Sequence, residues 1–150
     1  MLGELSYEEI KDVLENNFVG RIGCSDGQKI YVVPISYLFK NDGVICHSRD
    51  GMKVRMMRIN PNVCFEVDEI KNYENWRSVI AWGAYRELRG AEEAEARQFF
   101  SEVMLSQKAS LTSLPPDSVA ENQLNTKTIG DSVFYKITFS EVTGRFERDL

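Results

Sequence analysis

Three segments rich in β-branched and aromatic residues follow one another early in the chain, and only short turn sequences separate them. The segments are residues 18–24, 29–39 and 44–47, joined by Ser25-Asp26-Gly27 and Asn41-Asp42-Gly43. Asp, Asn and Gly favour the tight turns that link antiparallel neighbours. Such connections are too short for the crossover that parallel strands require. The sequence therefore predicts an antiparallel meander.

The remaining elements follow from hydrophobic periodicity. Three further strands are predicted, at residues 63–67, 76–88 and 133–140. Three helices are predicted, at residues 6–17, 52–59 and 91–107. Ser6 and Glu9 form a capping-box pattern that marks the start of the first helix. Irregular segments are predicted at residues 71–75, 108–131 and after residue 140.

These elements amount to about six strands and three helices, with hairpin connections and no alternation of strand and helix. The predicted fold class is therefore α+β with an antiparallel sheet. Long antiparallel strands tend to close into a barrel, because closure removes exposed sheet edges. A length of 150 residues suits one domain, and we expect a single domain over residues 1–150.

Charge and composition exclude several functional classes. The formal net charge of -5 argues against nucleic-acid binding, which needs a basic face. No apolar stretch approaches the roughly 20 residues that cross a bilayer, and the acidic first helix is not a signal peptide. Cys24, Cys46 and Cys64 are widely spaced and show no metal-binding pattern. We therefore expect a cytoplasmic protein with reduced thiols, no metal and no membrane partner.

The segment from Cys46 to Lys53 leaves a strand, turns at Gly51 and enters a helix. A helix N-terminus presents free backbone N–H groups and a partial positive charge, so it suits an anion. His47, Ser48 and Lys53 add donors or positive charge, and Arg49 adds another. The segment is either a phosphate site or a solvated basic turn, and local chemistry leaves both open.

Pro34 lies inside the second predicted strand. Proline lacks the N–H that a strand needs to pair on both sides, so it belongs on an edge, at a bulge or where pairing is interrupted. Either this strand leaves backbone groups free for a flat polar ligand, or it is a plain edge strand.

The sequence contains one histidine, His47, and no recognised hydrolase, zinc-protease or nucleotide-loop motif. His47 can serve as an acid–base group, as a haem ligand or as a structural residue. Trp76 and Trp82 can stack on an aromatic ligand, fill an interface or belong to the core. No catalytic residue is assigned.

An ordered set of short motifs resembles the pyridoxamine 5′-phosphate oxidase-like FMN-binding split-barrel family, and within it the branch that contains nitroimidazole-resistance proteins. The motifs are Val19-Gly20-Arg21-Ile22, Tyr31-Val32-Val33-Pro34-Ile35-Ser36-Tyr37, His47-Ser48 with Gly51 and Lys53, Asn60-Pro61-Asn62-Val63-Cys64-Phe65-Glu66-Val67-Asp68, and Trp76-Arg77-Ser78-Val79-Ile80 with Gly83.

The resemblance implies a six-stranded split barrel, and a homodimer with FMN at its interface. His47, Ser48 and Lys53 would hold the FMN phosphate. The strand containing Val33, Pro34, Ile35 and Ser36 would run beside the isoalloxazine ring and offer it backbone hydrogen bonds. Residues of the partner chain around Trp76 to Trp82 would complete the pocket.

The chain departs from the true oxidase at its C-terminal end, which lacks the tryptophan-containing segment that grips pyridoxal phosphate in that enzyme. Oxidation of pyridoxamine phosphate is therefore not expected. The resemblance implies instead an FMN-dependent oxidoreductase that uses small-molecule electron donors and acceptors. The alternatives are a non-catalytic module that stores or senses flavin, and a haem protein that uses His47.

Overall fold

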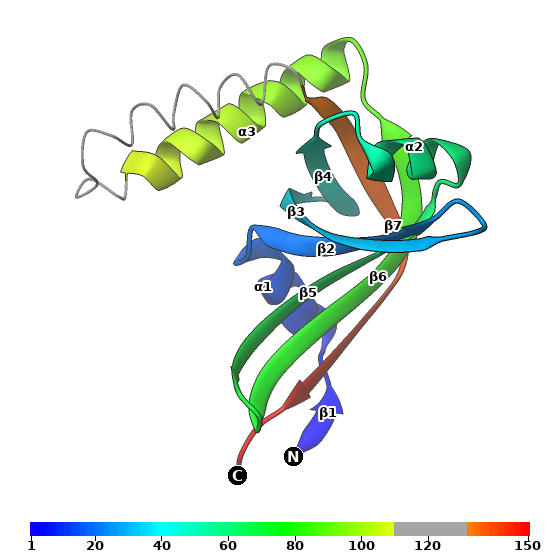
Figure 1. The fold of residues 1–150 in the computed structure, drawn as a ribbon. Helices are drawn as coiled ribbons and strands as arrows, with labels where there is room; N and C mark the ends of the chain where they lie inside the picture. Colours follow the sequence, from blue (N-terminus) through cyan, green and yellow to red (C-terminus); the bar gives the residue numbers. More distant parts are fainter. Residues whose placement is uncertain (110–131) are drawn as a thin grey trace.

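The computed structural model describes residues 1–109 and 132–150 and contains three helices and seven strands in that part of the chain (Figure 1). In chain order they are β1 (Leu2–Glu4), α1 (Tyr7–Glu15), β2 (Val19–Ser25), β3 (Ile30–Lys40), β4 (Gly43–Ser48), α2 (Met52–Ile59), β5 (Asn62–Asn72), β6 (Asn75–Glu87), α3 (Ala91–Ala109) and β7 (Val133–Glu147).

Six strands close into a barrel. They lie side by side in the order β7-β4-β3-β2-β5-β6, and β6 pairs again with β7. Every neighbouring pair is antiparallel, including β1, which adds to the far end of β7. The predicted α+β fold with a six-stranded antiparallel barrel is confirmed.

Two glycines allow β7 to fit between its neighbours. A Cβ atom on Gly43 of β4 would lie 2.0 Å from the carbonyl oxygen of Ile137. A Cβ atom on Gly83 of β6 would lie 2.2 Å from the carbonyl oxygen of Thr138, beside an irregularity in the β6–β7 register. No side chain can occupy either space, so glycine at both positions permits barrel closure.

Helix α1 packs its apolar face against the barrel core. Its capping box forms as predicted: the Glu9 backbone N–H donates to Ser6 Oγ, and Ser6 N–H donates to Glu9 Oε1, both at 3.2 Å. Ile10, Val13 and Leu14 are buried in the core. The Leu14 carbonyl accepts a hydrogen bond of 2.8 Å from the buried hydroxyl of Tyr37, which ties α1 to β3.

Helix α3 packs on the outside of the barrel over β4 and β7. Its Ala96 and Phe100 join Ile45, Leu88 and Phe134 in a small cluster that is separate from the main core. Of the predicted irregular segment, residues 108 and 109 belong to α3 and residues 110–131 lie outside the described part of the chain.

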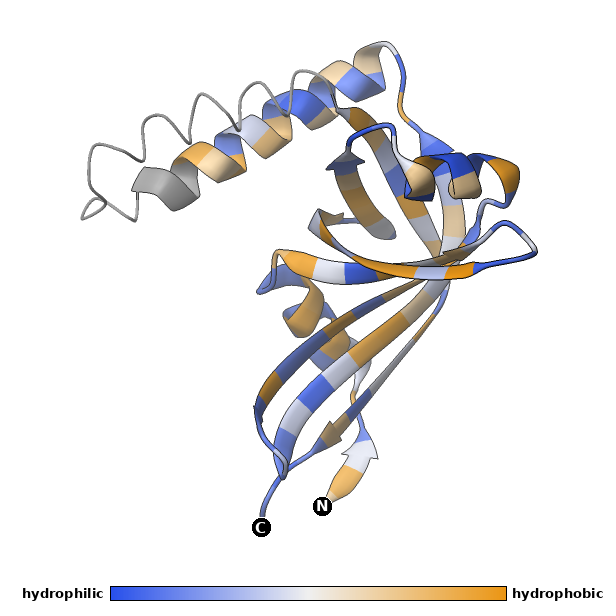
Figure 2. Ribbon diagram, viewed as in Figure 1, coloured by the Kyte–Doolittle hydropathy of each residue, from blue (hydrophilic) through white to orange (hydrophobic). Residues whose placement is uncertain are grey.

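The outward side of β3, β2, β5 and β6 forms one continuous surface, which we call the outer sheet face. The strand registers align Val32, Gly23, Cys64 and Trp82 in one row across it. The face carries several exposed apolar side chains, with Val32 at 63% and Trp82 at 40% exposure. Figure 2 shows hydrophobic colour along β3 and the middle of β6.

Three segments differ from the sequence prediction. Residues 71 and 72 belong to β5 and residue 75 to β6, so the predicted polar connection is reduced to a tight turn. Strand β7 continues to Glu147 instead of ending at residue 140, and β1 was not predicted at all. In each case pairing with a neighbouring strand overrides a polar local sequence, because strand propensity depends strongly on context.

Candidate functional site

Strand β3 has an open edge. Over residues 30–36 it pairs with β2, but its described pairing with β4 is confined to Tyr37–Lys40. Strand β4 pairs with β7 along its whole length, but its last two residues, His47 and Ser48, have no partner on β3. The two strands therefore separate at Ser36, and the edge of β3 before that point has no strand beside it in the described structure.

Alternation along β3 determines which backbone groups point to the open edge. The Tyr37 N–H donates to Phe18 O at 3.0 Å, toward the β2 side. Alternate residues of a strand direct their N–H and C=O groups to opposite sides. Pro34 and Ser36 therefore direct theirs to the open edge, and so does Val32, which the sequence reasoning did not single out. The backbone groups of Val33 and Ile35 point toward β2.

The position of Pro34 follows from the same alternation. Pro34 lies opposite Arg21 in the β2–β3 register, at a position where β3 offers β2 no hydrogen bond. The missing N–H therefore removes nothing from the β2–β3 pairing. Its ring faces outward and is exposed, whereas Ile35 is buried in the core.

Helix α2 begins without a side-chain cap. Gly51 is its N-cap and makes no side-chain hydrogen bond, and the first turn contains no acidic residue. Asp50 pairs instead with Arg58, at 3.2 Å. The first turn carries Lys53, although the helix dipole disfavours a cation there. Uncapped amides together with a lysine are the arrangement that an anion would stabilise.

Lys53 lies over the barrel end near β2 and β4. Burial raises the pKa of the Cys24 and Cys46 thiols, whereas the positive charge of Lys53 lowers both pKa values. Lys53 is therefore close to both thiols. Cys24 belongs to β2 and Cys46 to β4, and β3 lies between these strands. The half-buried Lys53 is therefore on the side of the barrel where the open edge begins.

Ser48 and His47 point to opposite faces of β4. The Ser48 hydroxyl is buried and donates to Tyr135 Oη across a long 3.4 Å contact on the core side, the same side as Cys46. The His47 ring lies under α3, 4.7 Å from the Phe100 ring and 5.5 Å from the Phe134 ring between centroids. The structure thus brings Ser48 and Lys53 to one side and places the His47 ring on the other.

The His47 ring occupies an apolar site. Its Nδ1 atom is buried and has no hydrogen-bond partner among the described residues. Burial lowers the pKa of His47, and the positive charge of Arg97 lowers it further. The ring is therefore neutral at physiological pH, and its edge-on contact with Phe100 places it beside α3.

Trp82 lies far from the open edge within one chain. Three strand spacings of about 4.8 Å separate it from Val32, which amounts to about 14 Å. Its ring stands on the outer sheet face, where a second molecule can contact it. The structure therefore does not join Trp82 to the other predicted site residues of the same chain.

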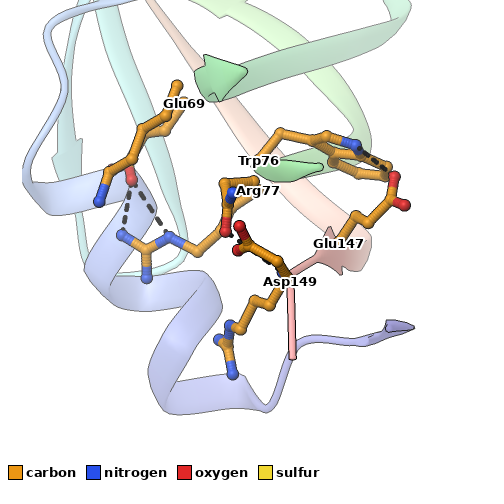
Figure 3. Close-up of a pocket in the computed structure, with 8 residues that line it drawn as sticks. Glu69, Trp76, Arg77, Glu147 and Asp149 are labelled. Carbon is orange, nitrogen blue, oxygen red and sulfur yellow. Dashed lines mark hydrogen bonds and ion pairs between the residues drawn. The ribbon is translucent and has the colours of Figure 1, made fainter. Parts of the chain in front are cut away.

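A charged depression of about 470 Å³ lies at the opposite end of the barrel (Figure 3). Arg77 pairs there with Glu69 at 2.7 Å and with Asp12 at 3.0 Å. The Trp76 indole donates to Glu147 at 3.1 Å. Because these polar groups already satisfy one another, the depression offers a ligand fewer free partners than the open edge does.

Two negative findings concern the described residues alone. No three His, Cys, Asp or Glu side chains in them come together as a metal site would require. None of the described helices has the length and apolar character needed to span a membrane.

Solved structures of similar proteins cover almost the whole chain. A FAD-binding protein from Mesorhizobium loti is 28% identical, with a TM-score of 0.75 over 99% of this chain and 98% of the other. A FAD-binding protein from Mycobacterium smegmatis is 25% identical, with a TM-score of 0.64 over 97% of this chain and 98% of the other. A 5-nitroimidazole antibiotic resistance protein assigned in Bacteroides thetaiotaomicron shares the fold at 16% identity, with a TM-score of 0.68 over 97% and 87%.

The resemblance noted in the sequence is thus matched by the architecture and by relatives that bind flavin. The sequence model of the family described as pyridoxamine 5′-phosphate oxidase matches residues 6–146. The chain belongs to the pyridoxamine 5′-phosphate oxidase family.

Proposed function

We propose that the chain binds FMN along the open edge of β3, with the phosphate at the start of α2. One observation carries the proposal: an unpaired strand edge and an uncapped, basic helix start occur at the same end of the barrel. The edge suits the polar rim of a flat ring, and the helix start suits a phosphate. The relatives named as FAD-binding support a flavin.

The residues have separate roles in this proposal. Lys53 supplies positive charge, and the first-turn amides of α2 supply donors to the phosphate oxygens. The Ser48 hydroxyl would donate a hydrogen bond to the phosphate. Its present contact with Tyr135 is long and therefore weak, so a phosphate oxygen could replace Tyr135 as the acceptor. The side chain of His47 would reach the phosphate only by leaving its site beside Phe100.

Pro34 and Ser36 would contact the ring rather than the phosphate. Ser36 offers both a backbone donor and an acceptor to the open edge, while Pro34 offers only an acceptor. Val33 and Ile35 would support this strand through β2 pairing and core packing. FMN is preferred to FAD because the described part of the site provides one anion-binding helix start and so accounts for one phosphate group.

The protein would act as a cytoplasmic flavin-dependent oxidoreductase on a small-molecule donor and acceptor. Bound FMN supplies the electron- and hydride-transfer chemistry. The chain binds and orients the ring, and the alternation of β3 sets which ring atoms meet donors and which meet acceptors. No side chain of the described site is required as an acid or base.

A homodimer would complete the site. The outer sheet face exposes large apolar side chains on adjacent strands, which is typical of an interaction surface. It also carries one charged cluster, in which Arg21 lies next to Glu66 and Asp68. Trp82 of a second copy would then be free to approach the flavin that its own chain cannot reach.

The first test is flavin binding by the purified, flavin-stripped protein. FMN and FAD would be titrated separately while flavin fluorescence is followed. We expect about one FMN per chain. Lys53→Ala should weaken FMN binding by about 10- to 100-fold, because a hydrogen bond to a charged group contributes about 1.5–3 kcal/mol. Lys11→Ala on α1 removes the same charge elsewhere and should leave the affinity unchanged.

Other outcomes would change the conclusion. Tighter binding of FAD than of FMN would overturn the choice of cofactor. Failure to retain either flavin would overturn the proposal, and a haem Soret band lost in His47→Ala would favour the haem alternative. Reduction of bound FMN by NAD(P)H no faster than that of free FMN, with no turnover of nitroimidazoles or quinones, would favour the storage module.

A further inference from the structure

The outer sheet face contains one polar cluster within its apolar surroundings. Arg21 on β2 lies opposite Glu66 on β5 in the strand register. Its Nη1 atom is 3.5 Å from Glu66 Oε1 and 3.7 Å from Asp68 Oδ2. Glu66 and Asp68 are two residues apart on one strand, so both point to the same side. One guanidinium thus faces two carboxyl groups, and the cluster has an excess of negative charge.

Glu66 is the less well compensated of the two acids. Its Oε1 atom is inaccessible to solvent, accepts no hydrogen bond within the described structure and lies 3.5 Å from Arg21 Nη1. Burial and the adjacent Asp68 carboxyl raise the pKa of Glu66 to about 7, while Arg21 opposes this rise. The carboxyl group therefore exchanges a proton near neutral pH even in the isolated chain.

The neighbouring strands offer no second cation to this cluster. On β6, Ile80 lies opposite Glu66 and Ser78 lies opposite Asp68. On β5, the Cys64 thiol is kept neutral, because burial and then the charge of Glu66 raise its pKa. On β3, the residue next to Arg21 is Pro34. Removal of water from the face would leave the second carboxylate without a counter-charge.

We propose that pairing of two copies through the outer sheet face takes up protons at the Glu66–Asp68 carboxyl pair, so that acid strengthens the dimer and alkali weakens it. This inference rests on the proposed homodimer. An uncompensated charge is costly to bury, and a shared proton removes it while adding a hydrogen bond between the two carboxyl groups. The mostly apolar hollow of about 590 Å³ beside the pair, between Trp76 and Tyr73, would be filled by the second copy.

The dimer dissociation constant as a function of pH tests this inference. The flavin-loaded protein would be diluted from micromolar to nanomolar concentration between pH 5.5 and 9, with dimer and monomer counted by sedimentation or mass photometry. Below about pH 6 the constant should be flat, because Glu66 is already protonated in the monomer. Above pH 7 it should rise, by up to about 100-fold per pH unit if each protomer takes up one proton.

Two variants locate the effect. Glu66→Gln copies the protonated acid and should dimerise tightly with little dependence on pH. Glu15→Gln removes one carboxylate from the exposed side of α1 and should retain the pH dependence of the unmodified protein. Dilution calorimetry in two buffers of different ionisation enthalpy would count the released protons directly, even if a variant folds poorly.

The outcomes separate this inference from the homodimer itself. A dimer whose dissociation constant does not change with pH would overturn the inference and leave the homodimer in place. A pH dependence that persists in Glu66→Gln would overturn the assignment to this carboxyl pair. A chain that is monomeric at every pH would overturn both the homodimer and its proton uptake.

Discussion

Removal of a single hydroxyl tests how β3, the strand with the open edge, is fixed to the barrel. Tyr37 is 1% exposed, and its hydroxyl donates to the Leu14 carbonyl at 2.8 Å. That carbonyl is among the last four of α1, which have no N–H partner within the helix. In Tyr37→Phe the ring remains against Phe65, but the buried carbonyl loses its donor. The expected loss of unfolding free energy is about 1–3 kcal/mol.

Tyr135→Phe is the matched control. Tyr135 is also fully buried, but within the described residues its hydroxyl contacts only Ser48, at 3.4 Å. A contact of that length is weak, so the expected loss is below about 1 kcal/mol. Burial raises the pKa of both phenols, and neither ionises between pH 5 and 9. The two variants therefore differ mainly in the geometry of one hydrogen bond.

Urea unfolding followed by tryptophan fluorescence measures both losses, at one protein concentration and without added flavin. The slope of free energy against urea should stay the same, because neither change alters the surface that unfolding exposes. Heating offers a second readout, at about 2–4 °C per kcal/mol for a chain of this size. An equal or larger loss in Tyr135→Phe would refute the reasoning from hydrogen-bond geometry.

Three further predictions concern other parts of the fold. Gly83→Ala should lower the free energy of unfolding in urea by at least about 3 kcal/mol, because the new Cβ would clash with the backbone of β7. Gly23→Ala should lower it by less than about 1 kcal/mol, because its Cβ would make an ordinary contact at 3.8 Å. Ser6→Ala should cost about 1 kcal/mol by removing the α1 cap, and no loss would argue against the capping box. Burial lowers the pKa of His47, so the unfolded chain binds its proton more readily and stability should fall as the pH drops below about 6.5. An NMR titration that gave His47 a pKa above 6.5, or an unchanged pH profile in His47→Gln, would contradict this.

Local sequence patterns predicted the elements whose stabilising contacts lie within or next to them. The capping box at Ser6 and the turns around Gly27 and Gly43 depend on residues a few positions apart, and the predicted elements they mark are present. Strand β7 beyond Ser140 could not be delimited in the same way. Its inward positions include Gly144, which has no side chain to reveal the alternation, and its pairing partner β6 is distant in sequence.

The candidate site was predicted as a set of residues but not as a geometry. Pro34 indicated interrupted pairing, and the structure places the interruption beside it. The opposite directions of His47 and Ser48 follow from strand alternation, and the sequence contained that information once β4 was recognised as a strand. The cluster of Arg21, Glu66 and Asp68 could not be found from spacing, because the register of β2 against β5 brings together residues 45 positions apart in the chain.

The place of β7 in the barrel has a consequence for biosynthesis. This strand pairs with β4, β6 and β1, and its register joins Leu2 to Glu147 across nearly the whole chain. Until β7 has emerged from the ribosome, β4 and β6 each lack a neighbour, and the sheet remains open with unpaired edges that can bind other chains. Barrel closure must therefore wait until β7 has been synthesised, and the long sequence separations predict a slow reaction, on the order of milliseconds to seconds. Before β7 is available, a nascent chain of this kind depends on protection of those edges more than a helical protein of equal length does.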